Sequence, residues 1–417
     1  MNGFSQAVSC LTDKNGAEIS PIINDASRRD NAVLIINLAG DDAYAQINGY
    51  ILQRRAGTAA EGASALAQAA NCSEVIVYSG VPDAKLLAED IKTRSNITVS
   101  VMAGPASPVL RDDTALFSAM ENGVVRANRA EHEFLSGFQS YGYMGRPTVV
   151  VDGETAYRAG RLSAEPGALP TKLISISSAD SVKEVPEGTS VSSLLKEHGL
   201  SGVSLIGGVC GRFYGESEYD GLCIGHGYEW DSIRVFREGD CIVDELVRHY
   251  SMIYELQCSK CVLCREGSKQ LHAIFSDIAK GRSKRNDLDL IADICPIIHS
   301  GALCSFGKNM VMPALTSVSA CLDIIRKHTV SKTCPSGRCA GLMKYIIDPS
   351  ICDGCGDCAD SCPEDAIDGK DGFIHVIDDK LCDKCGECVS ACPSDAIKPD
   401  NGSIRTPKKP VKAGMFK

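Results

Sequence analysis

The sequence lacks several features that mark common protein classes. It contains one Trp, aromatic residues make up 6% of its 417 positions, and no run of 18 apolar residues occurs. The first 22 residues show no basic start followed by an apolar stretch. Neither a membrane-spanning helix nor a secretory signal is therefore indicated. We expect a cytoplasmic protein with roughly two to four compact domains.

Loops that bind nucleotide phosphates are also missing. No Gly-x-Gly-x-x-Gly follows a predicted strand, and no Walker loop occurs. The glycine-rich segment 207–211 is interpreted as a turn. The net charge of −10 disfavours a nucleic-acid surface. Residues 401–417 form a basic tail, which is either a solvated extension or a strap that docks an acidic partner.

Cysteine, in contrast, is abundant, with 21 residues, of which 16 lie between Cys258 and Cys392. Eight of them form a run that occurs twice, in which two residues separate each of the first three cysteines and a Cys-Pro pair follows: Cys352, Cys355, Cys358, Cys362 and Cys382, Cys385, Cys388, Cys392. This is the signature of bacterial two-cluster ferredoxins, where three thiolates bind one [4Fe-4S] cluster and the fourth ligates the other. The spacing predicts two ligand sets: Cys352, Cys355, Cys358 with Cys392, and Cys382, Cys385, Cys388 with Cys362. A zinc ribbon or a disulfide knot is the alternative. Thiols kept reduced as metal ligands suit a cytoplasmic, anaerobic setting.

A third group of cysteines precedes this repeat. Cys258, Cys261 and Cys264 are again separated by two residues each, and Cys304 stands alone in a short Gly-bounded segment. We expect these four thiolates to bind a third [4Fe-4S] cluster, with a structural zinc ion as the alternative.

His328, Cys334 and Cys339 lie within twelve residues of one another in the sequence. They suit a closed tetrahedral site if a fourth ligand is near. Cys321 is our choice, because seven residues before His328 is two turns along the same face of a continuous helix; Cys295 is the other candidate. Structural zinc is favoured over a further Fe–S cluster or plain core thiols. The remaining cysteines show no ligand spacing and are interpreted as small buried residues: Cys10, Cys72, Cys210, Cys223 and Cys241.

Hydrophobic periodicity divides the rest of the chain. After an N-terminal extension of 30 residues, segment 31–164 alternates short apolar strands with helical patterns, which predicts an α/β domain with parallel strands. Segment 165–245 is predicted to be a small α+β module. Four helical patterns in 246–332 predict a four-helix bundle. A connector, the ferredoxin repeat and the tail complete the chain: 333–348, 349–400 and 401–417.

Together, Gln257–Gly267, Leu303–Gly307, the Cys334–Cys339 connector and the ferredoxin repeat resemble one family. It is the flavoprotein subunit that oxidises NADH in respiratory complex I, in the longer form found in multimeric [FeFe]-hydrogenases and NAD-linked formate dehydrogenases. Thr148–Thr155 is similar to the family's segment ending in Asn-Val-Glu-Thr, and Arg111–Leu116 to its Gly-Glu-Glu-Thr-Ala-Leu. The resemblance implies that the α/β domain is an FMN- and NADH-domain-like fold. The α+β module would be an SLBB-like β-grasp, and the bundle would hold one cluster.

Three elements of the family's flavin pocket are altered here. The loop Gly-Arg-Gly-Gly-Ala-Gly-Phe-Pro, whose backbone N–H groups hold the FMN phosphate, is missing. Asn37–Tyr44 stands where relatives have the acidic turn Asn-Ala-Asp-Glu-Gly-Glu-Pro-Gly. Val151-Asp152 replaces the paired Asn residues, and a carboxylate there repels phosphate. We therefore expect FMN to be absent.

These observations predict an iron–sulfur subunit that relays single electrons through three [4Fe-4S] clusters and is not itself catalytic. The alternatives are an FMN-containing NAD(P)H dehydrogenase with a divergent flavin pocket, or a ferredoxin fused to a ligand-binding domain. The resemblance implies a soluble hydrogenase or formate dehydrogenase complex, or a similar ferredoxin- or NAD-linked one. Its other members would be a large catalytic subunit, a thioredoxin-like [2Fe-2S] subunit and an FMN-bearing paralogue, with ferredoxin as a partner.

Overall fold

The computed structural model describes residues 11–14, 16–41, 43–81, 83–128, 142–165, 167–176, 182–225, 227–400 and 404–416. Cys10 lies outside these residues. The chain divides into two compact units. The first contains 1–237, 248–273 and 286–322, and the second contains 238–247, 274–285 and 323–417. None of the helices described is long and apolar enough to cross a membrane.

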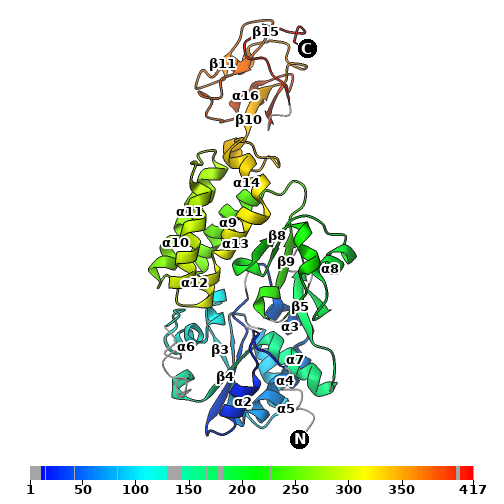
Figure 1. Cartoon of the computed structure of the whole chain (residues 1–417), viewed down its shortest axis with the longest axis vertical. Coiled ribbons are helices and arrows are strands. Elements are labelled where there is room, and N and C mark those ends of the chain that lie inside the picture. The colour runs from blue at the N-terminus through cyan, green and yellow to red at the C-terminus, as the bar shows by residue number, and fades with distance from the viewer. Residues whose placement is uncertain are drawn as a thin grey trace. The chain divides into compact units, whose positions relative to one another are not determined.

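A parallel four-stranded sheet forms the N-terminal part of the first unit (Figure 1). Its strands follow the order β3 (Thr98–Ala103), β2 (Cys72–Ser79), β1 (Ala32–Asn37) and β4 (Thr148–Asp152). All neighbouring strands run parallel. The central strand β1 is buried along its whole length, which explains its continuous apolar run. The expected α/β layering with parallel strands is confirmed.

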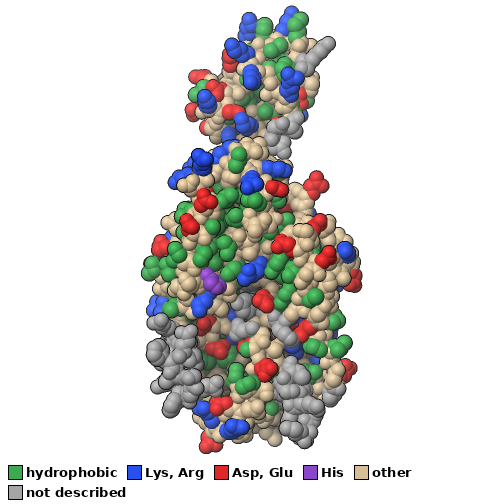
Figure 2. Space-filling view, viewed as in Figure 1, with side chains coloured by type: hydrophobic (Ala, Val, Ile, Leu, Met, Phe, Trp, Pro, Cys, Tyr) green, Lys and Arg blue, Asp and Glu red, His purple; other side chains and the backbone are tan. Residues whose placement is uncertain are grey.

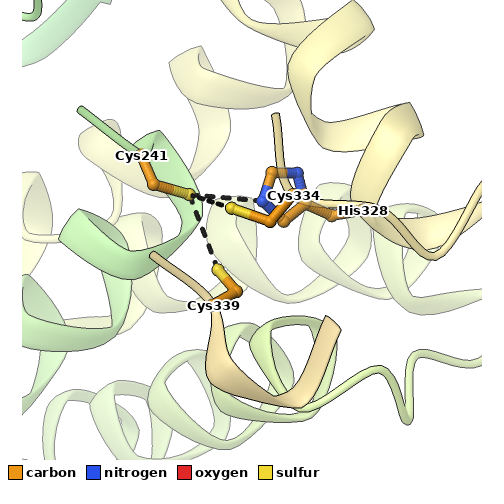
Figure 3. A group of neighbouring side chains, drawn as sticks. All are labelled: Cys241, His328, Cys334 and Cys339. Atoms are coloured by element: carbon orange, nitrogen blue, oxygen red, sulfur yellow. Dashed lines mark hydrogen bonds between the residues drawn. The ribbon is translucent and has the colours of Figure 1, made fainter. Parts of the chain in front are cut away.

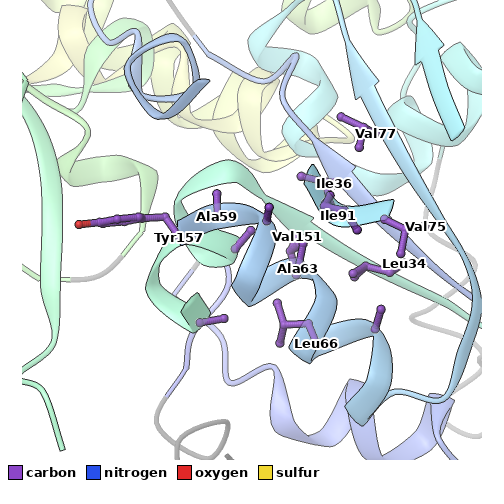
Figure 4. Close-up of a cluster of buried hydrophobic side chains, with 14 of the residues drawn as sticks. Leu34, Ile36, Ala59, Ala63, Leu66, Val75, Val77, Ile91, Val151 and Tyr157 are labelled. Carbon is purple, nitrogen blue, oxygen red and sulfur yellow. The ribbon is translucent and has the colours of Figure 1, made fainter. Parts of the chain in front are cut away.

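Helices precede, connect or follow these strands. They are α2 (Ser20–Ala26), α3 (Ile47–Arg54), α4 (Ala56–Ala69), α5 (Ala84–Arg94), α6 (Asp113–Asn122) and α7 (Gly153–Ala164). Ala59, Ala63 and Leu66 of α4 belong to the same buried cluster as Leu34 and Val75 of the sheet (Figure 4). The alanine-rich face of α4 therefore lets this helix lie close to its neighbours.

Helices α4 and α7 cross with their backbones very close together. A Cβ at Gly160 of α7 would lie 1.9 Å from the carbonyl oxygen of Thr58. We expect Gly160→Ala to lower the free energy of unfolding by about 2 kcal/mol or more, since backbone atoms must move apart to admit the methyl group. Gly57→Ala on α4 is the matched control, because its Cβ would meet only an Arg94 side-chain nitrogen at 3.8 Å. That change should raise stability by up to about 1 kcal/mol. Denaturant unfolding measures both, and equal effects would contradict the close crossing.

A second, mixed sheet follows in the first unit. Its order is β6 (Val182–Pro186), β5 (Thr171–Ile176), β9 (Ser232–Val235), β7 (Ser204–Ile206) and β8 (Arg212–Tyr214). Only β5 and β9 pair in parallel. Helix α8 (Val191–Glu197) packs with this sheet in one apolar cluster. Within 207–211, residues Gly208–Cys210 form a short 3-10 turn, as expected.

The helical region contains more helices than the four patterns predicted. It comprises α9 (Ile242–Leu256), α10 (Val262–Ala279), α11 (Asp287–Gly301), α12 (Ser305–Asn309), α13 (Met312–Ala320) and α14 (Leu322–Thr329). The pattern from Leu315 to Ile325 predicts one helix, but the backbone leaves the helical conformation at Cys321 (φ −122°, ψ 24°). No Gly or Pro marks this break in the sequence.

The C-terminal part of the second unit repeats one small motif at an offset of 30 residues. Strand β10 (Lys344–Ile347) pairs with β14 (Ile397–Asp400), and β13 (Val376–Ile377) pairs with β11 (Ile367–Asp368), both antiparallel. Each half contributes a short helix around its third cysteine: α15 (Asp357–Asp360) and α16 (Glu387–Ala391). In the tail, β15 (Val411–Lys412) pairs with β12 (Phe373–Ile374). Part of the expected basic tail is thus ordered in a strand instead of being a solvated extension.

Acidic and basic side chains are interspersed over the face of the molecule drawn in Figure 2. No continuous basic stripe crosses that face among the residues that are described.

Candidate metal centres

The ferredoxin repeat brings the four thiols of one predicted ligand set to one cavity. Cys352, Cys355, Cys358 and Cys392 all line it, together with apolar residues of β10 and β14. Burial is the main cause that raises the pKa of Cys358 to about 12, and the thiols of the other three cysteines raise it further. Such a thiol is neutral at pH 7 and loses its proton only when a metal binds. The predicted ligand set is therefore assembled in space.

The other set of the repeat is assembled in the same way. Burial raises the pKa of Cys388, and Cys382, Cys362 and Cys385 are close enough to raise it further. In each half, the cysteine that precedes Pro accepts a backbone hydrogen bond: Ala366 N donates to Cys362 Sγ, and Ala396 N to Cys392 Sγ, both at 3.3 Å. Such N–H···S bonds stabilise thiolates that ligate iron.

The third set lies in the first unit, around the start of α10. Cys258 and Cys261 precede this helix, and Cys264 is buried in its first turn. Burial raises the pKa of Cys264 to about 12, with further contributions from Cys304, Cys258 and Cys261. Cys304 caps the N-terminus of α12 and accepts a hydrogen bond from Gly307 N at 3.4 Å. All three sets consist of soft thiolate donors, which suit iron–sulfur clusters.

A fourth group, in the second unit, brings three thiols and one imidazole close together (Figure 3). The ligand atoms of Cys241, His328, Cys334 and Cys339 all lie within 4.8 Å of one another, and all four residues are buried. Cys241 Sγ lies 3.2 Å from His328 Nε2, 3.6 Å from Cys339 Sγ and 3.7 Å from Cys334 Sγ. The hydrogen bond from Cys339 is the main cause that lowers the pKa of Cys241 to about 3, against the effect of burial.

A hydrogen bond at Nδ1 orients the imidazole of His328, whose Nε2 lies near Cys241. His328 Nδ1 lies 2.8 Å from the carbonyl oxygen of Ile324, one turn earlier on α14. A ring whose Nδ1–H donates to a backbone carbonyl presents the lone pair of Nε2, which is the arrangement of most metal-ligating histidines. Although burial lowers the pKa of His328, hydrogen bonds with Cys241 and Ile324 raise it to about 9, so a metal that binds Nε2 must displace a proton.

The fourth member of this group corrects the prediction made from sequence. Cys241 completes it, and neither Cys321 nor Cys295 belongs to it. The seven-residue spacing of Cys321 from His328 assumes a continuous helix, but Cys321 stands at the break between α13 and α14. Cys241 precedes α9, and no local spacing links it to the other ligands, which lie 87 to 98 residues later. Of the other cysteines interpreted as core, Cys72 is buried and Cys210 is partly buried, but Cys223 is exposed.

The first unit also brings together the three segments that were matched to the family's flavin pocket. Asn37 and Asp41, Arg111, and Asp152 with Glu154 come from different parts of the chain and line one cavity of about 20 Å³. That volume has room for about one water molecule. Asn37 Nδ2 donates to the carbonyl oxygen of Leu110 at 2.8 Å, which ties the first segment to the second.

Buried charges fill the space beside this cavity. Lys172 of β5 pairs with Glu154 and, at 2.6 Å, with Asp231, while Arg111 pairs with Asp231 at 2.8 Å. Arg111 Nε also donates to the carbonyl oxygen of Gly40 at 2.7 Å. Burial raises the pKa of Glu154, although Lys172 opposes this effect. Sequence reasoning missed Lys172 and Asp231, because neither lies in a segment matched to the flavin site.

Two family models match parts of the chain. Residues 245–328 match the NADH-ubiquinone oxidoreductase-F iron-sulfur binding region. Residues 351–396 match a 4Fe-4S dicluster domain. The first range contains the set with Cys258 and Cys304, and the second contains both sets of the repeat.

Individual relatives match over limited lengths. The NADP-reducing hydrogenase subunit HndC of Solidesulfovibrio fructosivorans is 37% identical over 135 residues, which are 32% of this chain and 28% of HndC. An NADH-quinone oxidoreductase subunit of Streptomyces coelicolor is 28% identical over 104 residues, or 25% of this chain and 23% of that protein. The matches thus span about a quarter of the length of these relatives.

A solved structure shares the fold over a longer range. A chain of the NAD+-reducing [NiFe]-hydrogenase in its H2-reduced state superposes with a TM-score of 0.70 at 19% identity. The superposition covers 78% of this chain and 62% of the hydrogenase chain. With the two family models, the protein is thus a relative of the NADH-ubiquinone oxidoreductase F family that carries its 4Fe-4S binding region and a C-terminal 4Fe-4S dicluster domain.

Proposed function

We propose that this chain is an iron–sulfur electron-transfer subunit of a multi-subunit oxidoreductase, such as a hydrogenase or formate dehydrogenase. The observation that carries the proposal is the assembly of three separate sets of four cysteines. Each set, when it holds a [4Fe-4S] cluster, can accept and pass on one electron at a time. The chain itself buries at least one thiol of each set and supplies N–H···S hydrogen bonds that tune the cluster.

We also infer that, among the residues described, those at the position of the family's flavin pocket form no FMN or NADH site. A cavity of about 20 Å³ beside Arg111 and Glu154 is far below the roughly 300–1,000 Å³ of small-molecule pockets. Four carboxylates line it, against the two cations Lys14 and Arg111, so its lining carries an excess of acidic groups, which disfavours a phosphate: Asp41, Asp152, Glu154 and Asp231. These carboxylates already have partners in the chain. For example, Asp152 caps the N-terminus of α7 by accepting from Thr155 N at 2.7 Å.

Chemical analysis of the purified full chain tests this function. After anaerobic reconstitution we expect about twelve irons and twelve acid-labile sulfides per chain, the content of three cubanes. No flavin should appear in the supernatant after denaturation, with a known flavoprotein of the same family as the positive control. Release of one FMN per chain would overturn the flavin-free proposal and favour an NAD(P)H dehydrogenase with a divergent pocket. An iron content of zero, with zinc in its place, would overturn the electron-transfer function.

For the group of Cys241, His328, Cys334 and Cys339 we propose one structural zinc ion. Four bonds of about 2.3 Å in a tetrahedron place two sulfurs about 3.8 Å apart, close to the 3.6 and 3.7 Å between these thiols. A cubane binds its four thiolates to four different irons, so it needs them farther apart. Complete burial of the group suits a closed site without an open coordination position.

We propose the domain boundaries that the sequence implied, with an FMN- and NADH-domain-like fold over 31–164, a β-grasp module over 165–245, a helical bundle over 246–332 and a ferredoxin domain over 349–400. We also propose the partners that the resemblance implied. The mixed sheet with α8 supports the SLBB-like β-grasp module, the helices α9 to α13 support the cluster-bearing bundle, and the repeated motif supports the ferredoxin domain. Partners would be a large catalytic subunit, a thioredoxin-like [2Fe-2S] subunit and an FMN-bearing paralogue. The names of relatives, among them a hydrogenase subunit and an NADP(+)-dependent formate dehydrogenase subunit of Moorella thermoacetica, support such a complex.

A further inference from the structure

One histidine lies against the first cluster cavity of the ferredoxin repeat. His375 is 2% exposed and lines the same cavity as Cys352, Cys355, Cys358 and Cys392. Its Nδ1 is buried and has no hydrogen-bond partner among the residues that the structure describes. No other histidine occurs between residues 349 and 400. A buried polar atom without a partner is rare in folded proteins and calls for a ligand or a functional explanation.

We infer that the Nδ1–H of His375 donates a hydrogen bond to a sulfur of the cluster at Cys352, Cys355, Cys358 and Cys392. The inference rests on the proposed function, which places a [4Fe-4S] cluster there. Thiolate and sulfide sulfurs are acceptors only, so a ring nitrogen that is hydrogen-bonded to one of them must carry the proton. Gly369 leaves space for the ring, because a Cβ at this position would lie 2.2 Å from His375 Cδ2. The ring is thus held in place by close packing.

The repeat offers an internal comparison for this histidine. At the offset of 30 residues, His375 corresponds to Tyr345, whose hydroxyl lies against Gly386 in the loop of the other ligand set. The backbone around the two sets is otherwise alike. Ala366 N and Ala396 N donate to equivalent sulfurs at the same distance of 3.3 Å. Cys355 N and Cys385 N donate to equivalent Asp carboxylates at 3.1 and 3.0 Å.

The two clusters of the repeat should therefore differ in reduction potential. A hydrogen bond to sulfur favours the reduced, more negative state of a cluster, so a donor raises the potential. His375 supplies such a donor to one cluster, whereas the hydroxyl of the corresponding Tyr345 lies against Gly386 instead of a cysteine sulfur. The cluster beside His375 should have the higher potential, and an electron delivered to the repeat should reside there.

Redox titration of the reconstituted full chain, followed by EPR, tests this inference. His375→Phe keeps a ring but removes the donor, so the reduction constant of the neighbouring cluster should fall about tenfold, or about 59 mV for one electron. His375→Asn is the conservative variant, because its amide nitrogen stands as many bonds from the backbone as Nδ1; its potential should stay within about threefold of the original. Tyr345→Phe, the matched control, should leave this cluster unchanged. An unchanged potential in His375→Phe, or equal shifts in the Phe and Asn variants, would overturn the inference.

A second measurement covers the case in which His375→Phe does not retain its cluster. Pulsed EPR of the reduced, unsubstituted chain labelled with 15N-histidine should detect a nitrogen coupled to a cluster spin, and the coupling should vanish in His375→Asn. Absence of that coupling in the unsubstituted chain would overturn the hydrogen bond. Iron and sulfide counts separate this outcome from failure of the proposed function: clusters without the coupling reject only the role of His375, whereas missing clusters reject the function itself.

Discussion

Cys241→Ser is expected to release the zinc ion from the second unit and to lower the free energy of unfolding by about 3 kcal/mol or more. The reason is that a hydroxyl is a far poorer zinc ligand than a thiolate, and three ligands cannot close a tetrahedral structural site. Apparent zinc-binding free energies of about 10–16 kcal/mol in small metal-dependent domains show how much stability such a site can hold. Metal analysis of the purified chain and denaturant unfolding are the measurements.

Cys321→Ser is the matched control, since Cys321 is equally buried and is the ligand expected from sequence. It should keep one zinc per chain. Cys321→Ser should lower the free energy of unfolding by about 1–3 kcal/mol, because it buries a hydroxyl in place of a thiol. Zinc content, more than stability, therefore distinguishes the two positions. If Cys321→Ser lost the metal while Cys241→Ser kept it, the assignment of the fourth ligand would be wrong.

Lys172→Met should lower the free energy of unfolding by about 3–5 kcal/mol. It leaves the buried carboxylates of Glu154 and Asp231 without the ammonium that both contact. Burial raises the pKa of Glu154, and Lys172 is the first of the groups that lower it. In the variant, Glu154 should take up a proton as the pH falls. A carboxyl whose pKa is raised in the folded state makes the protein more stable as the pH falls. The free energy of unfolding lost through Lys172→Met should therefore be smaller at pH 5 than at pH 8.

Arg29→Met provides the comparison for this change. Arg29 pairs with Asp25 at 3.1 Å on the surface, where the two side chains are 35% and 38% exposed. Exposed pairs of this kind contribute about 0–1 kcal/mol. Thermal unfolding at both pH values measures the two variants. A cost of Lys172→Met no larger than that of Arg29→Met would show that the pocket beside Glu154 is open to water, and the flavin-free proposal would lose its main support.

Local spacing allowed the three cysteine sets to be predicted from sequence. In Cys352, Cys355 and Cys358 the ligands are separated by two residues, so the chain must wrap around one metal centre whatever surrounds it. The same applies to the parallel sheet: the apolar run of β1 is a property of adjacent residues, and a strand buried on both faces requires it.

The fourth ligand of the histidine-containing group and the partners of the buried charges were decided only by the tertiary structure, because they involve residues that are distant in the sequence. Cys241 lies 93 residues before Cys334 and carries no pattern that marks it as a ligand, while the break at Cys321 removes the helix on which the expected ligand depended. Lys172 lies in β5, Glu154 in α7 and Asp231 directly before β9, and the sequence around each gives no sign that its charge is buried. The spacing of ligands that are a few residues apart is fixed by the sequence itself. The partners of a buried charge or a lone thiol depend on which separate elements pack together.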